Sequence, residues 1–470
     1  MKIMGMGVNS CGQLLFPPME EDAFTQSIIC ALDRNVARTR ALARASLEGV
    51  SFGRELDRAA EDLADPRSAG WTFLVNRDDP SRARIEEILE PLARHRGMSD
   101  PKKPLLYATQ PADEWLNWLN DNYYSLELDH QRVPRYILVV GDPSQVPFLF
   151  QSLLGTVANV GRVDFDDLGD LGTYIDKLIR VETASEPLVS AKTLLFAPDH
   201  GLPDPTYFSR EYMVAPLREY IEVELRAKTR AITGPDATKK ILMQGFAANP
   251  ALVYSASHGL GAIDRPVDFQ KRYNGAVCCQ HEGALSFDAL FTADDVPKDR
   301  PFLEGAVFFQ FACFGYGTPA QSDFAHWLDG VPKDYAPAGF VAALPKALLA
   351  HPRGPIAFVG HLDTAFLHGF ANAEEPHILE RWHTRVAPFV SAVRRLLEVQ
   401  PCALAMEFMS KRYSISNTLI TNTYDRVERG ALQWSAELKT RFLDNWIVRG
   451  DSQNYLILGD PAARLRIPSP

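Results

Sequence analysis

Short runs of residues that are apolar at nearly every position recur along this chain, and segments with helical periodicity separate them. A strand that is apolar on both faces has to be covered on both faces, which is typical of a parallel sheet between two layers of helices. The alternation therefore predicts an α/β fold with a largely parallel sheet. The main runs begin at Trp71, Pro104, Arg135, Thr193, Leu252, Ala306, Ile356 and Tyr455.

The clearest predicted helix covers residues 166–182, where apolar side chains recur on one face behind an aspartate that can serve as N-cap. A second helix is predicted from Ser209, despite Pro216. After about Glu375 the pattern becomes helical, and the last of three predicted helices covers residues 432–446.

A chain of 470 residues exceeds the size at which one hydrophobic core usually stops growing, so two lobes are expected. The polar segment of residues 185–192 contains a proline and follows a complete helix. It is the predicted boundary between an N-terminal lobe, residues 1–185, and a second lobe, residues 190–470.

The formal net charge of −10 argues against a dedicated nucleic-acid binder, which needs a basic face. No run approaches the roughly 18 to 20 apolar residues of a membrane span, and residues 1–16 lack the apolar region of a secretory signal. Six cysteines are too sparse for a disulfide framework, so reduced thiols are expected. The adjacent Cys278 and Cys279 do not predict a metal site with His281, because neighbours on a strand point to opposite faces.

Two of the apolar runs end at a reactive side chain with glycine close behind. LVYSASHGLG, from Leu252, ends at His258, and AVFFQFACFGYGTP, from Ala306, ends at Cys313. In open α/β sheets the turns beyond the carboxyl ends of the strands gather side chains over one crevice. We therefore expect the imidazole and the thiol to meet at one edge of the sheet.

A thiol and an imidazole together can hydrolyse a peptide bond, since the thiolate attacks the carbonyl carbon and the imidazole returns a proton to the leaving amine. Gly259 lets a backbone N–H approach the substrate carbonyl, and with the amide of Cys313 it could form an oxyanion hole. Each residue alone has a structural interpretation too, as a buried core histidine or an inert buried cysteine.

The two motifs, an apolar block before His-Gly and an apolar block before Ala-Cys, resemble the signature of the caspase-fold cysteine peptidases (clan CD). Three further stretches are similar to the gingipain branch of that clan: RYILVVGDPSQVPF from Arg135, VGRVDFDDLGDLGTYIDKLIRVE from Val160 and LILGDPAARLRI from Leu456. The resemblance implies a caspase-like three-layer fold with two α/β subdomains and C-terminal helices. Residues 1–185 would be the non-catalytic subdomain and residues 190–470 the catalytic one.

In this resemblance Cys313 matches the nucleophile, His258 the general acid and Gly259 an oxyanion donor. Asp199 would line the pocket for a basic side chain before the cleaved bond, although a turn or helix cap is an equally good interpretation. His200 is a weaker candidate for the catalytic histidine.

Other residues near the two motifs are candidates for contact with substrate. Tyr316 could pack on a bound peptide or could belong to a strand-to-helix turn. The acids that could orient His258 or face substrate, or could simply be solvated, are Asp264, Glu282, Asp323 and Asp363.

The sequence thus predicts a cysteine endopeptidase that acts on protein or peptide substrates, without cofactor or metal. Gingipains carry a signal peptide and a propeptide. Neither pattern is evident here, so we expect a bacterial, cytoplasmic enzyme, restrained by a regulatory protein partner in stress or defence. One alternative is a catalytically silent scaffold that binds peptides or protein partners. Another is a nucleotide-sensing module, suggested weakly by Gly259 and Gly261 in a pattern that lacks its third glycine.

Overall fold

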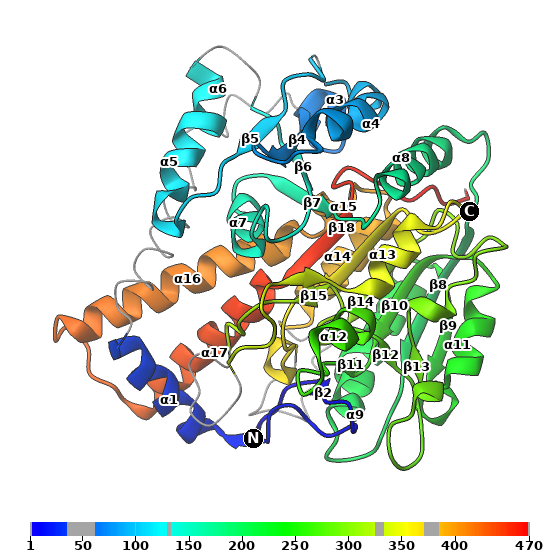
Figure 1. The fold of residues 1–470 in the computed structure, drawn as a ribbon. Coiled ribbons are helices and arrows are strands. Elements are labelled where there is room, and N and C mark those ends of the chain that lie inside the picture. Colours follow the sequence, from blue (N-terminus) through cyan, green and yellow to red (C-terminus); the bar gives the residue numbers. More distant parts are fainter. Residues whose placement is uncertain are drawn as a thin grey trace.

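The computed structural model describes residues 2–34, 62–98, 100–128, 133–324, 333–370 and 385–468. Within them one ten-stranded sheet runs through the molecule in the order β5-β4-β6-β7-β18-β17-β14-β10-β8-β9 (Figure 1). In chain order its strands are β4 (Trp71–Asn76), β5 (Leu105–Tyr107), β6 (Tyr136–Val140), β7 (Asn159–Val163), β8 (Ser190–Ala197), β9 (Lys228–Thr233), β10 (Pro250–Ala256), β14 (Val307–Phe311), β17 (Ala357–His361) and β18 (Tyr455–Gly459).

The sheet consists of two parallel halves that run in opposite directions. Strands β4 to β7 pair in parallel, and β18 joins β7 in parallel through Leu458 and Arg162. Strands β8, β9, β10, β14 and β17 form the other parallel set. The two sets meet at the antiparallel pair of β17 and β18. Their carboxyl ends therefore lie at opposite edges of the sheet.

Helices cover both faces of the sheet. Successive side chains of a strand point to opposite faces of the sheet. Phe308 and Phe311 of β14 are three positions apart, so their side chains lie on different faces. The Phe308 ring packs on Phe246 of α11 (Lys239–Phe246), whereas the Phe311 ring packs on Phe389 of α14 (Ala387–Leu397). The predicted three-layer α/β fold with a largely parallel sheet is confirmed.

The remaining α-helices alternate with the strands along the chain or follow them (Figure 1). They are α1 (Glu21–Arg34), α3 (Pro66–Ala69), α4 (Arg82–His95), α5 (Trp115–Leu119), α6 (Ser125–Leu128), α7 (Phe148–Leu154), α8 (Leu168–Thr183), α9 (Pro205–Ser209), α10 (Ala215–Val223), α12 (Val267–Tyr273), α13 (Ala343–Ala350), α15 (Cys402–Ala405), α16 (Glu407–Glu428) and α17 (Ala436–Gln453). By the criterion of length and hydropathy, none of the described helices could cross a membrane.

The strongest predicted helix is α8, and Asp167 is its N-cap, accepting a hydrogen bond from the Gly169 N–H. The helix predicted from Ser209 is divided into α9, a π-helical turn (Arg210–Val214) and α10. Pro216 is the second residue of α10, directly after the π-helical turn, so the helix is irregular just where the proline cannot donate an N–H. The last helix, α17, begins and ends later than the predicted 432–446. Residues 375–384 of the predicted helical region lie outside the described residues.

The predicted boundary segment, residues 185–192, follows α8, and its last three residues already belong to β8 of the continuous sheet. A buried ion network connects the residue that follows α4 with α8 and with the residue that follows β18. The Arg96 guanidinium contacts Glu182 of α8 at 2.7 Å and Asp460, just after β18, at 2.6 Å. The division at residues 185–190 stays a prediction.

A small second sheet lies beside the carboxyl end of β10. Its order is β13-β12-β11-β2. The strands are β2 (Gly7–Val8), β11 (Gly259–Leu260), β12 (Val277–Cys278) and β13 (Leu290–Phe291). Because β11 begins directly after His258, this sheet brings the N-terminal residues of the chain to the end of β10 (Figure 1).

Candidate active site

The strands that carry His258 and Cys313 are direct neighbours. Strand β10 pairs in parallel with β14, with Ala256 opposite Phe311, so both residues follow at the same edge of the sheet. The backbones stay in contact beyond the strands, since a Cβ atom on Gly259 would overlap the carbonyl oxygen of Cys313. Only glycine fits there, and the two motifs meet at one edge as the sequence predicts.

The Cys313 thiol is completely buried. The backbone N–H of Ala365, in the loop after β17, donates to its Sγ atom at 3.1 Å. Burial raises the pKa of this thiol well above its usual range, and the hydrogen bond from Ala365 offsets only part of that shift. In this form of the protein the sulfur is therefore a neutral thiol rather than a thiolate.

The residue after Cys313 has an unusual backbone. Phe314 has φ of 58°, a conformation that costs energy for a residue with a side chain. It is held there by the hydrogen bond from its N–H to the Asp363 carbonyl at 3.1 Å. A strained turn directly beside the sulfur is the kind of geometry that is found at functional sites.

Both ring nitrogens of His258 face hydrogen-bond acceptors. The Nε2 atom lies 3.0 Å and 3.1 Å from the two carboxylate oxygens of Asp204, and Nδ1 lies 2.6 Å from the carbonyl oxygen of Met6. Burial lowers the pKa of His258, but the hydrogen bond and charge of Asp204, with the Met6 carbonyl, outweigh it and raise the pKa overall. The arrangement suits a protonated imidazolium.

Asp204 is the acid that orients His258, and the sequence analysis missed it. Its pKa is held well below the usual range, because the bonds and charge of His258 outweigh burial. The same carboxylate caps α9 by accepting from the Thr206 N–H at 2.9 Å. The sequence signal for Asp204 was the Asp-Pro pair that begins a helix shortly after β8. Because β8 pairs with β10 in parallel, residues after β8 lie at the same edge of the sheet as His258.

The acids proposed for this role lie elsewhere. Asp264 is half exposed and accepts from the Ser10 hydroxyl at 2.6 Å, and Glu282 is exposed. Asp363 is fully buried and accepts from the Ser322 hydroxyl at 2.8 Å and the Thr364 N–H at 2.7 Å. It thereby shapes the loop that carries Ala365, rather than contacting His258.

Residues 4–8, called here the N-terminal segment, run in extended form over the site. On one side the Met6 N–H donates to the Ala365 carbonyl at 2.9 Å. On the other side β2 pairs in parallel with β11, with Gly7 opposite Gly259. A Cβ atom on Gly7 would lie 3.4 Å from the Cys313 Sγ atom. The segment thus covers the thiol and occupies Nδ1 of His258.

The predicted substrate contacts are engaged within the protein. Asp199 pairs with Arg210 at 3.0 Å and accepts from the Gly201 N–H at 2.8 Å, as the turn interpretation requires. Tyr316 is fully buried, packs on Phe148 and has a pKa raised to about 12, chiefly by burial. In this form it is not available to a bound peptide.

His200, the weaker histidine candidate, lies beside the site. Its ring centroid is 5.9 Å from that of His258, and its Nε2 atom is 3.2 Å from Nδ1 of His281. Cys278 and Cys279, which precede His281, are buried in two different hydrophobic clusters, consistent with side chains on opposite faces. Cys279 contacts His281 only through its backbone carbonyl, which accepts from the His281 Nδ1–H at 3.1 Å.

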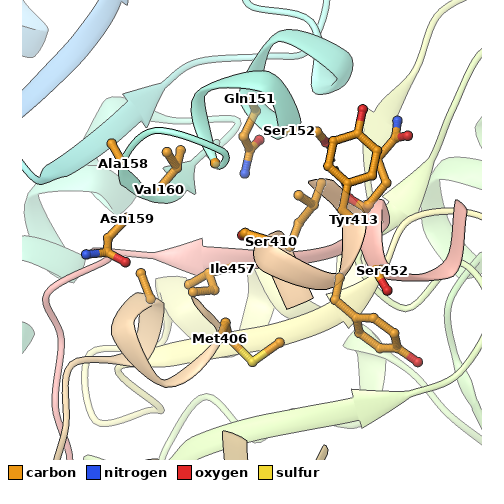
Figure 2. Close-up of a pocket in the computed structure, with 15 residues that line it drawn as sticks. Gln151, Ser152, Ala158, Asn159, Val160, Met406, Ser410, Tyr413, Ser452 and Ile457 are labelled. Atoms are coloured by element: carbon orange, nitrogen blue, oxygen red, sulfur yellow. Dashed lines mark hydrogen bonds between the residues drawn. The ribbon is translucent and has the colours of Figure 1, made fainter. Parts of the chain in front are cut away.

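Two cavities lie away from this site. One, of about 50 Å³, lies between α7, β7, α16 and β18, and its lining includes Gln151, Val160, Tyr413 and Ile457 (Figure 2). The other, of about 820 Å³, is lined in part by Arg67, Glu182 and Arg466. Neither is lined by the candidate catalytic residues.

No protein-family model matches this sequence, and no curated protein sequence is similar to it. Among solved structures the chain is similar to the Arg-specific cysteine proteinase gingipain R, with 14% identity and a TM-score of 0.42 over 86% of this chain and 79% of that one. The complex of Porphyromonas gingivalis RgpB pro- and mature domains matches at 14% identity and 0.42, over 84% and 80% of the two chains. The Saccharomyces cerevisiae separase–securin complex matches at 11% and 0.33, over 83% of this chain and 23% of that one. Similarity this low does not by itself assign an activity or a site.

Proposed function

We propose that this chain is a cysteine endopeptidase that cleaves peptide bonds through Cys313 and His258. The observation that carries the proposal is their position beyond adjacent parallel strands, with the His258 ring held by Asp204. The resemblance of the two motifs to caspase-fold peptidases supports it independently of the geometry.

In the proposed reaction the Cys313 thiolate attacks the substrate carbonyl carbon, and the C–N bond breaks as His258 donates a proton to the leaving amine. Water then hydrolyses the thioester and releases the carboxylic acid. The backbone N–H groups of Gly259 and Cys313 would stabilise the negative oxygen of each tetrahedral intermediate. Asp204 stabilises the imidazolium and fixes its orientation, which makes it a positioning residue.

The described form is the closed state of the proposed enzyme. The N-terminal segment is held by backbone hydrogen bonds on both sides, as an extended peptide substrate would be held. It must leave before a substrate carbonyl can approach the Cys313 sulfur, and its departure would also relieve the burial that raises the pKa of the thiol. A protein partner that displaces the segment would therefore switch the enzyme on.

A second candidate function is a catalytically silent scaffold that binds an extended peptide in the place of the N-terminal segment. The buried neutral thiol and the occupied ring nitrogens of His258 favour it. The two functions differ in one measurable property, because a scaffold binds peptides without cleaving them.

The test is a peptide-library cleavage assay that compares the intact chain, a variant with the N-terminal segment displaced (Met6→Asp), and Met6→Asp combined with Cys313→Ala. We expect cleavage by Met6→Asp, weak or no cleavage by the intact chain, and none by the double variant. Cleavage that survives Cys313→Ala would refute the proposed nucleophile. Peptide binding by a folded Met6→Asp without any cleavage would favour the scaffold.

The same peptide library also measures which residue type is preferred before the cleaved bond. A preference for arginine or lysine there is proposed from the family resemblance and Asp199. Since Arg210 already pairs with Asp199, this preference requires that the substrate side chain compete with Arg210. Equal cleavage after basic and neutral residues would exclude it.

A further inference from the structure

We infer that His200, Asp204 and His258 form a binding site for a divalent transition-metal ion, with Zn²⁺ as the best fit. One ligand atom from each residue lies within 4.8 Å of the others. Within the described ranges this is the one such group of histidine, cysteine and acidic residues. Two ligands come from the loop after β8 and one from the end of β10, so neighbouring strands hold the site.

Hydrogen bonds at Nδ1 make the Nε2 atom of each histidine the candidate ligand, once the ion replaces the proton or N–H that Nε2 now shares. His258 points Nδ1 at the Met6 carbonyl, 2.6 Å away, and directs Nε2 at Asp204. A backbone carbonyl on the second ring nitrogen is the usual outer partner of a histidine that binds a metal.

In His200 the Nδ1 atom is likewise hydrogen-bonded, in this case to the Thr206 hydroxyl. The Thr206 hydroxyl donates to Asp204, a carboxylate that can only accept. Because the hydroxyl uses its proton in that bond, it must accept from the His200 Nδ1 atom, which is 3.2 Å away. Nδ1 of His200 therefore carries a proton. The Nε2 atom of His200 therefore keeps its lone pair, and the Nδ1–H of His281 faces it at 3.2 Å. Because that N–H also lies 3.1 Å from the Cys279 carbonyl oxygen, an ion could replace it at Nε2 without leaving it unpaired.

Two imidazole nitrogens and one carboxylate oxygen form a ligand set that suits Zn²⁺, with a fourth position left for water or a further side chain. The ion would take the place of the proton that His258 shares with Asp204. The three ligand atoms already lie within 4.8 Å of one another. Since bonds from Zn²⁺ to nitrogen and oxygen are about 2.0 to 2.2 Å long, side-chain rotation would bring them onto the ion.

Metal binding would remove His258 from proton transfer. If the proposed peptidase function holds, Zn²⁺ is therefore an inhibitor that acts on the general acid rather than on the thiol. This consequence rests on the proposed function, whereas binding of the ion does not.

The first experiment measures Zn²⁺ binding to the full chain by competition with a chromophoric chelator. We expect one site that is weakened at least tenfold by His200→Ala and by Asp204→Asn. His95→Ala is the matched control, because His95 also pairs with a buried carboxylate, Glu182, at 2.8 Å, and is not part of the group. Unchanged affinity in a folded His200→Ala would overturn the inference, as would the absence of binding to the intact chain.

Co²⁺ in place of Zn²⁺ identifies the ligand atoms. Nitrogen and oxygen ligands give visible d–d bands without the thiolate charge-transfer band of a cysteine ligand. A thiolate band would assign the metal to one of the cysteines, such as the exposed Cys11 or Cys30, and contradict the site proposed here.

A second experiment compares cleavage by Met6→Asp at increasing free Zn²⁺, with and without His200→Ala, each relative to its own metal-free rate. We expect His200→Ala to shift the inhibitory concentration upward at least tenfold. Equal inhibition of both would refute inhibition through this site. If Met6→Asp cleaves nothing, the peptidase proposal fails while the Zn²⁺ measurement still decides the metal site.

Discussion

Replacement of Met6 by aspartate is expected to displace the N-terminal segment and expose Cys313. The Met6 side chain is fully buried, its N–H donates to Ala365 and its carbonyl accepts from His258. An aspartate there loses the apolar burial and places a charge in the main hydrophobic cluster, where the Met6 side chain packs. Both effects favour the state in which the N-terminal segment is displaced.

The size of the effect follows from the burial. Full burial of a methionine side chain contributes about 1.5 to 3 kcal/mol. Since each 1.4 kcal/mol is a factor of ten in an equilibrium constant, loss of that contribution raises the displaced population by about 10- to 140-fold. The cost of the buried charge adds to this, so the range is a lower bound. Met6→Leu, which conserves volume, should cost less than about 1.5 kcal/mol and serves as the control.

The assay is the rate of alkylation of Cys313 by iodoacetamide, followed by peptide mass spectrometry. A buried thiol reacts through the open state, so its rate tracks the open population when closing is fast. Cys11 is exposed and gives the rate of a free thiol in the same sample, while the buried Cys402 reports any global unfolding.

Two results would refute the reasoning. In one, Cys313 of a folded Met6→Asp variant reacts no faster than in the intact chain, which would mean that the segment does not control access. In the other, Cys402 accelerates as much as Cys313, which would mean that the substitution unfolds the protein instead of displacing the segment.

Two further predictions concern buried charges. Arg96→Ala leaves Asp460 buried without its cation and Glu182 with His95 alone, so we expect a loss of about 3 to 5 kcal/mol in urea unfolding. Arg94→Ala, at an exposed position, is the control, and an equal loss there would contradict the argument. Burial, followed by the charge of a nearby aspartate, raises the pKa of Asp363 from 3.8 to about 6. The folded state therefore binds this proton more tightly than the unfolded chain, and the contribution to stability is lost as pH rises from about 4 to 6. Asp363→Asn should accordingly become more stable relative to the intact chain between pH 4.5 and 7, and a difference in unfolding free energy that does not change with pH would refute this.

The sequence by itself was enough to predict most helices and strands and the positions where the strands end. Runs such as the one that became β14 are apolar on both faces, and the periodicity of α8 and its aspartate cap are local properties that need no partner. His258 and Cys313 could be selected because each directly follows such a run. That they meet follows from the pairing of β10 with β14, which the parallel α/β pattern already favours.

Only the tertiary structure decided what surrounds those two side chains. Asp204 is 54 residues from His258 along the chain and Met6 is 252 residues away, so no local pattern connects them. The reversal of direction between β17 and β18, which places the two sets of carboxyl ends at opposite edges, likewise depends on which strands pair. Hydrophobic periodicity reports whether a residue is buried, but not which distant segment buries it. For that reason the covering of Cys313 by the N-terminal segment became visible only in the folded chain.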